Sequence, residues 1–251
     1  MQGLRLGLGF NQNLGGFNPS QIDGLIAWYD ASDTSTIVES GGAVSQWNDK
    51  SGNGNNATQG IVAAQPVTGT RTINGLNALD FDGSAAMSIP HTPFNGASGI
   101  TAFIVAQADT IASADRRLFQ LDGDSYFAGT YRASDNFLYG VHRMLSSDSF
   151  RFVAGTVAVD ENPFIFTNSS LQNGTPKVYY TGSSQAIGGA LSNNPVSFSQ
   201  GAIGDDNSGG ITSFDGRMTE VLFYSRELAS EETNQIGAYL GDKWGITWTD
   251  L

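Results

Sequence analysis

Many short apolar runs separated by turn-forming residues constrain this chain more than any other feature. The strongest run extends from Ile100 to Gln107, and glycine, asparagine and aspartate fill the gaps between the runs. The runs do not alternate with helical segments, as units of a parallel sheet would. This spacing is typical of antiparallel sheets packed face to face. We therefore predict an all-β fold, a two-sheet antiparallel jelly-roll sandwich.

The same pattern locates the other strands. Asn173-Gly174 is a turn signal, so the segments on either side of it should pair. We expect further strands in the segments Gly24–Asp30, Val44–Asp49, Ala78–Asp82, Ala86–Ile89, Arg117–Leu121, Tyr126–Gly129, Phe137–Val141, Phe150–Val159, Pro163–Asn168, Lys177–Thr181, Gly201–Gly204 and Phe214–Ser225.

One C-terminal helix is predicted to close the sandwich. Ser230 is a good N-cap, because its hydroxyl can accept a free backbone N–H, and Glu231 and Glu232 favour the first turn. Gly245 suits the left-handed position that ends a helix. The face expected to pack on a sheet consists of Ile236, Leu240 and Trp244.

Charge and cysteine content exclude several classes of function. The chain has 251 residues, a formal net charge of −12 and no cysteine. We expect no binding of nucleic acid by a basic face and no adhesion to an anionic membrane, because both need clustered lysine and arginine. Without cysteine there are no disulfides and no thiolate metal sites. No apolar stretch is long enough to span a membrane.

Residues 1–16 differ in character from the rest. Leucines alternate with arginine and glycine. A signal peptide would begin with a basic region followed by a continuous apolar region, and this segment lacks both, so we predict no signal peptide. We predict a docking arm over 1–16 and a single jelly-roll domain over 17–251, which we expect to form a homo-oligomer. The residues expected to contact a partner are Leu4, Arg5, Leu6, Leu8 and Phe10.

Four segments together carry a family resemblance. They are Ile22–Asp33, the turn Trp47–Asn55 (WNDKSGNGN), the pair Asn74-Gly75 with Leu79–Gly83, and the closing segment Phe214–Leu228. Their sequence and order resemble the concanavalin A-like lectin/glucanase superfamily, in particular laminin-G-like jelly rolls. The resemblance covers Phe17 to about Gly245 and implies a concanavalin A-like sandwich. It says little of function, because this fold serves enzymes, lectins and structural modules.

The chain departs from the family pattern in its acidic residues. Members often have an acid before the glutamate of the closing strand, and here Thr219 precedes Glu220. The Glu-x-Asp-x-x-Glu cluster of the glucanase branch is missing. The pairs Asp122/Asp124 and Asp205/Asp206 lie in turn-like segments, where aspartate stabilises turns.

The two histidines give no sign of catalysis either. His91 lies in an expected loop, and His142 is expected at a surface or an interface. No Gly-x-Ser-x-Gly elbow accompanies them. We therefore expect no enzymatic activity and no catalytic residues.

A calcium site is the one cofactor that the sequence suggests. Hard cations take oxygen ligands from aspartate side chains and loop carbonyls. The candidate ligands are Asp205, Asp206 and Asn207.

Aromatic and polar residues that could hold a glycan gather in one section. If the chain forms a hairpin there, several of them share a face. The competing interpretation is that Tyr126, Phe127, Phe137 and Tyr139 alternate between core and rim. The candidates are Tyr126, Tyr131, Arg132, Tyr139 and His142.

The sequence thus leaves three functional hypotheses. The first is a non-catalytic decoration or fibre protein on a phage virion, anchored by its arm to capsid or tail subunits and binding host or environmental glycans. The second is a free, extracellular carbohydrate-binding lectin. The third is a polysaccharide hydrolase or lyase. The leucine–glycine arm resembles those of bacteriophage virion proteins and favours the virion surface as the location.

Overall fold

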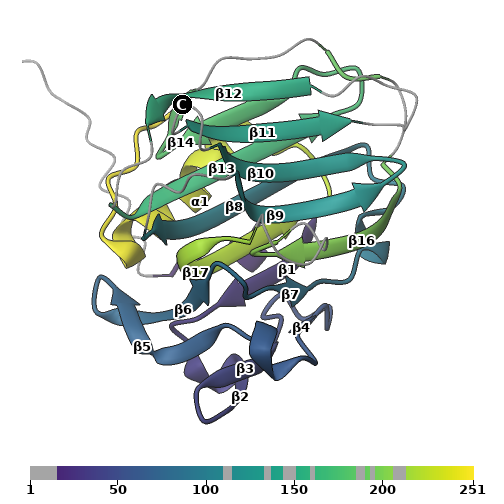
Figure 1. Ribbon diagram of the computed structural model, residues 1–251. Helices are drawn as coiled ribbons and strands as arrows, with labels where there is room; N and C mark the ends of the chain where they lie inside the picture. Colours follow the sequence, from purple (N-terminus) through teal and green to yellow (C-terminus); the bar gives the residue numbers. More distant parts are fainter. Residues whose placement is uncertain are drawn as a thin grey trace, which may run out of the picture.

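The fold is an antiparallel β-sandwich of two layers, which the computed structural model shows in Figure 1. The described residues are 16–109, 115–132, 137–143, 151–158, 162–184, 190–192, 196–205 and 213–251. The all-β sandwich expected from the sequence is confirmed. The boundary between an arm and the domain stays a prediction, because residues 1–15 lie outside the described part.

The first layer, sheet I, is built around β8 and β17. β8 (Gly99–Ala108) lies between β17 (Asp215–Tyr224) and β13 (Phe164–Leu171). β14 (Lys177–Tyr180) and β15 (Ser183–Ser184) extend the sheet beyond β13. On the other side, β17 pairs with β6 (Leu76–Asp82) along its first half and with β1 (Leu25–Asp30) along its second half.

The second layer, sheet II, runs from β12 across to β2. Its longer strands are β12 (Arg151–Ala158), β11 (Phe137–Arg143), β10 (Tyr126–Arg132), β9 (Arg116–Gly123) and β16 (Phe198–Ile203). β7 (Met87–Ser88), β4 (Ala57–Thr58), β3 (Ala43–Trp47) and β2 (Ile37–Ser40) continue it. β5 (Val67–Ile73) pairs with both β3 and β6, and so joins the two layers.

Four of these strands were not expected, namely β2, β5 and the two-residue strands β4 and β15. β2 and β5 are mostly exposed, and their sequences IVES and VTGTRTI contain no apolar run. Pairing with neighbours makes them strands, which residue patterns do not reveal. The turn between β5 and β6 has positive φ at both Asn74 and Gly75, as a two-residue hairpin requires.

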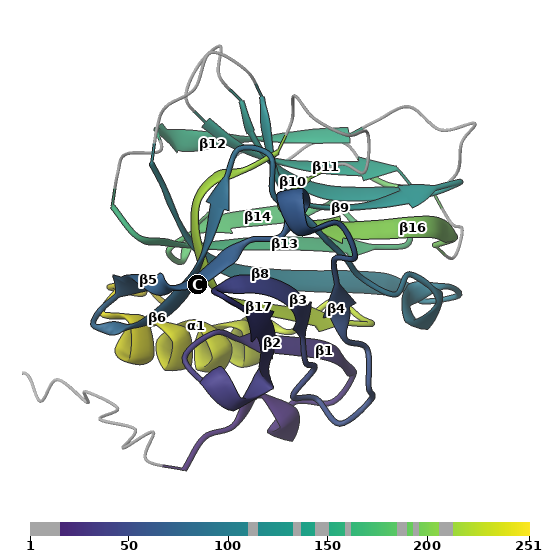
Figure 2. The same cartoon turned by 60° about the horizontal axis from the view of Figure 1, so that its bottom comes forward.

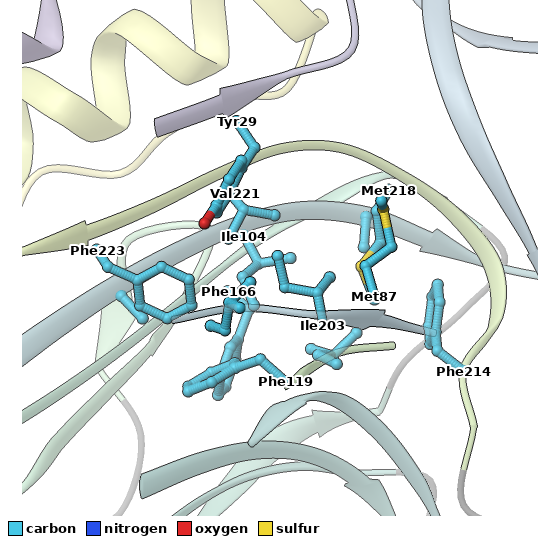
Figure 3. Packing of buried hydrophobic residues seen from close by; sticks show 14 of the residues in the cluster. Tyr29, Met87, Ile104, Phe119, Phe166, Ile203, Phe214, Met218, Val221 and Phe223 are labelled. Atoms are coloured by element: carbon cyan, nitrogen blue, oxygen red, sulfur yellow. The ribbon is translucent and has the colours of Figure 1, made fainter. Parts of the chain in front are cut away.

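Large apolar side chains fill the space between the sheets. Phe223 packs edge to face on Phe119 of the opposite sheet, with ring centroids 5.4 Å apart. Figure 3 shows these rings with their neighbours, which come from both layers. Because successive residues of a strand point to opposite faces, every second residue joins this core.

Helix α1 (Ser230–Trp244) covers the outer face of sheet I, as Figure 2 shows. Ile236, Leu240 and Trp244 are buried, as predicted, and Gly245 ends the helix with a φ of 69°. The predicted cap is wrong by one residue. Ala229 is the N-cap, and the side chain of Glu232 accepts its N–H at 2.9 Å. No helix in the described part is long and apolar enough to cross a membrane.

The turn after β3 forms a clasp on β1. The carboxylate of Asp49 accepts the backbone N–H groups of Trp28 at 2.9 Å, Ser51 at 2.8 Å and Asn55 at 2.9 Å. Ser51, Asn53 and Asn55 in turn donate to the carbonyl of Ile26. The turn Trp47–Asn55, one of the segments that carry the family resemblance, therefore has a structural role, because it satisfies the backbone of β1 where no strand of the described part pairs with it.

A charged network lies buried between α1 and sheet I. A bulge after Met218 shifts the alternation of β17, so that Glu220 points toward the helix. Its carboxylate accepts hydrogen bonds from the indoles of Trp28 and Trp244, both at 2.7 Å, and from the hydroxyl of Tyr239 at 2.9 Å. The ammonium of Lys243 pairs with Glu220 at 2.7 Å. It also pairs with Asp30 at 2.8 Å, and Lys50 contacts the other oxygen of Asp30 at the same distance.

Burial and pairing shift the two carboxyls of this network in opposite directions. Burial raises the pKa of Glu220 and outweighs the attraction of Lys243. Burial would also raise the pKa of Asp30, but the charge of Lys243 and the hydrogen bonds from Lys243, Lys50 and Ser32 outweigh it and lower that pKa.

Acid should destabilise the fold. Asp30 has a lowered pKa, and hydrogen bonds from Arg226 also lower the pKa of Glu232. Such groups stabilise the fold fully above their unfolded values near 4, and this contribution is lost as the pH falls through the lower folded values. Glu220 acts in the opposite sense, since its contribution is lost as the pH rises through its raised pKa. We expect the melting temperature to fall below about pH 4; a constant or rising value in calorimetry would contradict this.

Candidate functional site

Helix α1 covers the outer face of sheet I and does not cover the outer face of sheet II. On it, one transverse row crosses four strands: Gln200 of β16 lies opposite Asp122 of β9, Asp122 opposite Tyr126 of β10, and Tyr126 opposite Arg143 of β11. We call these four residues the rim row. Gln200 is exposed, and the other three are partly exposed.

Polar contacts hold the rim row in place. Arg143 donates to the carbonyl of Gly123 at 3.1 Å and approaches Asp122 at 4.0 Å. The side-chain amide of Gln200 reaches the other oxygen of Asp122 at 3.4 Å. The row thus presents an acceptor, an aromatic ring and a cation next to one another on adjacent strands.

A second row lies farther along the same strands. It consists of Arg117 of β9, Thr130 of β10 and Tyr139 of β11. Arg117 donates to Thr130 at 2.6 Å and to Gln120 at 3.2 Å. Gln120 also accepts the hydroxyl of Tyr126 at 2.5 Å, and so links the two rows.

Two of the predicted glycan-binding residues share this face. β10 and β11 form the hairpin on which the prediction depended, and Tyr126 and Tyr139 point to the same side. Tyr126 is partly exposed, whereas Tyr139 is only 6% exposed. Tyr126 is therefore the aromatic ring that a sugar can reach.

The expectation that Tyr131 and His142 lie on this face is corrected. They are 2% and 1% exposed, and they point between the sheets, where His142 packs on Phe127 at 5.5 Å between ring centroids. Burial lowers the pKa of His142 to about 3, so the ring is neutral at physiological pH. The physical reason is the alternation of strands, since Tyr131 is five residues from Tyr126 and His142 is three from Tyr139.

The other predicted residues are only partly described. Arg132 ends β10, but its side chain lies outside the described residues, as do Asp206, Asn207 and the docking residues Leu4, Arg5, Leu6, Leu8 and Phe10. Asp205 follows β16 and is buried. Among the described residues, no three histidine or acidic side chains group into a metal site. Calcium binding at Asp205, Asp206 and Asn207 stays a prediction.

A shallow pocket of about 460 Å³ lies at the end of α1, against the segment 246–250. Its lining includes Asp242, Asp250 and Trp248, and none of the predicted site residues. It lies on the helix side of the sandwich.

Sequence reasoning missed Arg117, Arg143 and Gln200 as members of this face. A signal for the face itself was present: Phe127 is a core residue by its character, which places Ala128 and Thr130 outward. Their partners across the strands follow only from the register, and a bulge between Gly129 and Thr130 changes it.

Comparison with known proteins gives a fold but no family. No model of a protein family matches the chain, and no curated protein matches it in sequence. The sandwich is similar to part of a Trypanosoma rangeli sialidase solved with sialic acid, with a TM-score of 0.61 and 16% identity. This match covers 90% of the chain and 34% of the sialidase, so the chain spans about a third of that protein.

Two other solved structures have the same sandwich. The binding domain of botulinum neurotoxin serotype D/C matches with a TM-score of 0.58 and 12% identity, over 92% of this chain and 56% of that domain. Domain 4 of an extracellular GH43 arabinanase from Geobacillus stearothermophilus, solved with arabinotriose, also has a TM-score of 0.58, with 15% identity. The match covers 84% of this chain and 97% of the arabinanase domain.

These similarities overturn the expectation that the chain is not an enzyme. A sialidase and an arabinanase both contain this sandwich, so the fold does not separate the chain from enzymes. At identities this low the likeness shows the fold alone.

Proposed function

We propose that the chain is a carbohydrate-binding β-sandwich domain that holds its glycan on the outer face of sheet II. The observation that carries the proposal is the rim row, in which the partly exposed ring of Tyr126 lies between Asp122 and Arg143. Sugars stack their apolar face on such a ring, and their hydroxyls bond to flanking acceptors and donors. The row offers these groups on rigid strands.

The arrangement of the layers supports this location. The outer face of sheet I is closed by α1, where Ile236, Leu240 and Trp244 are buried against it. The inner faces of both sheets form the core. A ligand of sugar size therefore finds polar and aromatic groups together on sheet II.

The similar structures agree with the proposal. The sialidase was solved with sialic acid, and domain 4 of the arabinanase was solved with arabinotriose. The match extends over 97% of the arabinanase domain and 34% of the sialidase.

Attachment to a larger assembly is compatible with glycan binding. Phe17, near the start of the described part, packs on Tyr239 of α1 with ring centroids 5.9 Å apart. We propose that an arm in residues 1–16 docks the domain onto capsid or tail subunits, while the outer face of sheet II binds the glycan. Membership among laminin-G-like domains of virion proteins belongs to the same proposal.

Replacing Tyr126 with alanine should abolish most glycan binding without unfolding the protein. The ring supplies the stacking surface, and stacking contributes about 1 kcal/mol or more, so we expect at least a roughly fivefold loss of affinity. The measurement is a glycan array followed by titration calorimetry with the best ligand. Tyr126→Phe keeps the ring and should retain most of the affinity.

Tyr179→Ala is the matched control, because Tyr179 is also a partly exposed tyrosine on a strand but lies on β14 of sheet I. The affinity of the Tyr179→Ala variant for the glycan should equal that of the unaltered protein. Binding that survives Tyr126→Ala would remove the rim row from the site, and an array without any signal would refute the proposed function.

A further inference from the structure

We infer that the glycan bound on sheet II carries carboxylate groups, an inference that rests on the proposed function. The first observation is the distribution of charge. The chain has 24 acidic and 12 basic residues, yet β9–β12 contain five of the basic ones and a single acid, Asp122. The five are Arg116, Arg117, Arg132, Arg143 and Arg151. Arg117 and Arg143 lie on the outer face, whereas Arg116 lies opposite the inward-pointing Tyr131 and donates to the carbonyl of Ser213 at 2.7 Å.

Arg117 carries the inference furthest. Its guanidinium is partly buried on the outer face, and its hydrogen bonds go to two neutral acceptors, Thr130 and Gln120. Arg117 belongs to none of the ion pairs that the described residues form with carboxylates. By contrast, Arg71, Arg143, Arg217 and Arg226 each lie within 4.0 Å of a carboxylate.

A partly buried guanidinium that pairs with no carboxylate of the described part is costly, and a bound carboxylate would offset that cost. The bonds to Thr130 and Gln120 fix the guanidinium before any ligand arrives, so little side-chain freedom remains to be lost. A carboxylate also matches the two parallel donors of the guanidinium better than a hydroxyl does.

Arg143 extends the same chemistry along the strands. The rows of Arg117 and Arg143 are separated by the distance from Tyr126 to Thr130 along β10, roughly 13 Å at the rise of a strand. Asp122 partly neutralises Arg143, at 4.0 Å. A chain of acidic sugars lying along β10 would reach Arg117 with one carboxylate and the ring of Tyr126 with another sugar of the same chain.

The test compares acidic glycans with their own neutral forms. Polygalacturonate, alginate and a sialylated oligosaccharide are each titrated against the full chain beside the carboxyl-reduced product. We expect the acidic form to bind roughly tenfold more tightly or better, as one charged hydrogen-bonded pair implies. Binding should weaken as salt is raised from about 50 to about 500 mM, because exposed charges are screened.

Arg117→Gln should lower the affinity for the acidic glycan about tenfold and leave the affinity for the neutral form unchanged. Arg117→Lys should retain part of the affinity for the acidic glycan. Lys177→Gln is the matched control, because it removes one positive charge from β14 of sheet I, and it should change neither affinity. Circular dichroism and melting curves confirm that each variant is folded.

The outcomes separate the two proposals. Equal affinity for acidic and neutral forms, or binding to neutral glycans alone, would overturn the acidic class and leave glycan binding in place. No binding to any glycan would refute the proposed function itself. Tighter binding to single-stranded RNA than to every acidic glycan would assign the arginines to phosphate and overturn the inference.

Discussion

Replacing Lys243 with methionine is expected to destabilise the protein by about 3–5 kcal/mol, the usual cost of breaking a buried ion pair. Lys243 contacts Glu220 at 2.7 Å and Asp30 at 2.8 Å, and the side chain of Glu220 is fully buried. Methionine retains the apolar length but leaves both carboxylates without this cation. Urea unfolding followed by circular dichroism measures the loss.

Lys177→Met is the matched control for this substitution. Lys177 pairs with Glu227 at 2.7 Å, but its side chain is 42% exposed, so the loss should stay below about 1 kcal/mol. Glu220→Leu combined with Lys243→Met should cost less than Lys243→Met alone, because no uncompensated charge remains at Glu220. If Lys243→Met cost no more than Lys177→Met, the network would not be what fixes α1 to sheet I.

Replacing Asp49 with alanine should destabilise the fold by about 2–4 kcal/mol. Its carboxylate accepts three backbone N–H groups and the hydroxyl of Ser51, and each donor left without a partner costs about 1 kcal/mol or more. The clasp is partly exposed, so water replaces some of the lost bonds. At this chain length the melting temperature should fall by about 2–4 °C per kcal/mol.

Asp33→Ala provides the comparison for Asp49. The side chain of Asp33 is 37% exposed and contacts only Ser35 and Lys50 in the described part, so its loss should cost under about 1 kcal/mol. Asp49→Asn keeps one acceptor oxygen and should fall between the two. Equal losses at positions 33 and 49 would mean that the clasp does not stabilise β1.

The clasp also explains why the fold could be recognised from sequence while the function could not. Asp49, Ser51, Asn53 and Asn55 bond to the backbone of β1 rather than to a ligand. Residues with this role stabilise the strand arrangement, whatever the protein binds. Their presence therefore indicates the sandwich and leaves the ligand open.

The candidate site was predicted only in part. Tyr126 and Tyr139 share the expected face, while Tyr131 and His142 point into the core. The sequence indicated the right hairpin, since both strands are apolar and aromatic. It did not reveal which strands flank the hairpin, and so Arg117 and Gln200 could not be joined to Tyr126 from the pattern alone.

By itself, the sequence determined the class of fold, most strand positions and the helix, because apolar periodicity and turn residues act locally. Tertiary structure alone decided which residues meet. The bulge after Met218 turns Glu220 toward α1, and the pairing of β16, β9, β10 and β11 assembles the rim row from segments far apart in the chain. Register depends on how whole sheets pack, and a shift of one residue exchanges the two faces of a strand.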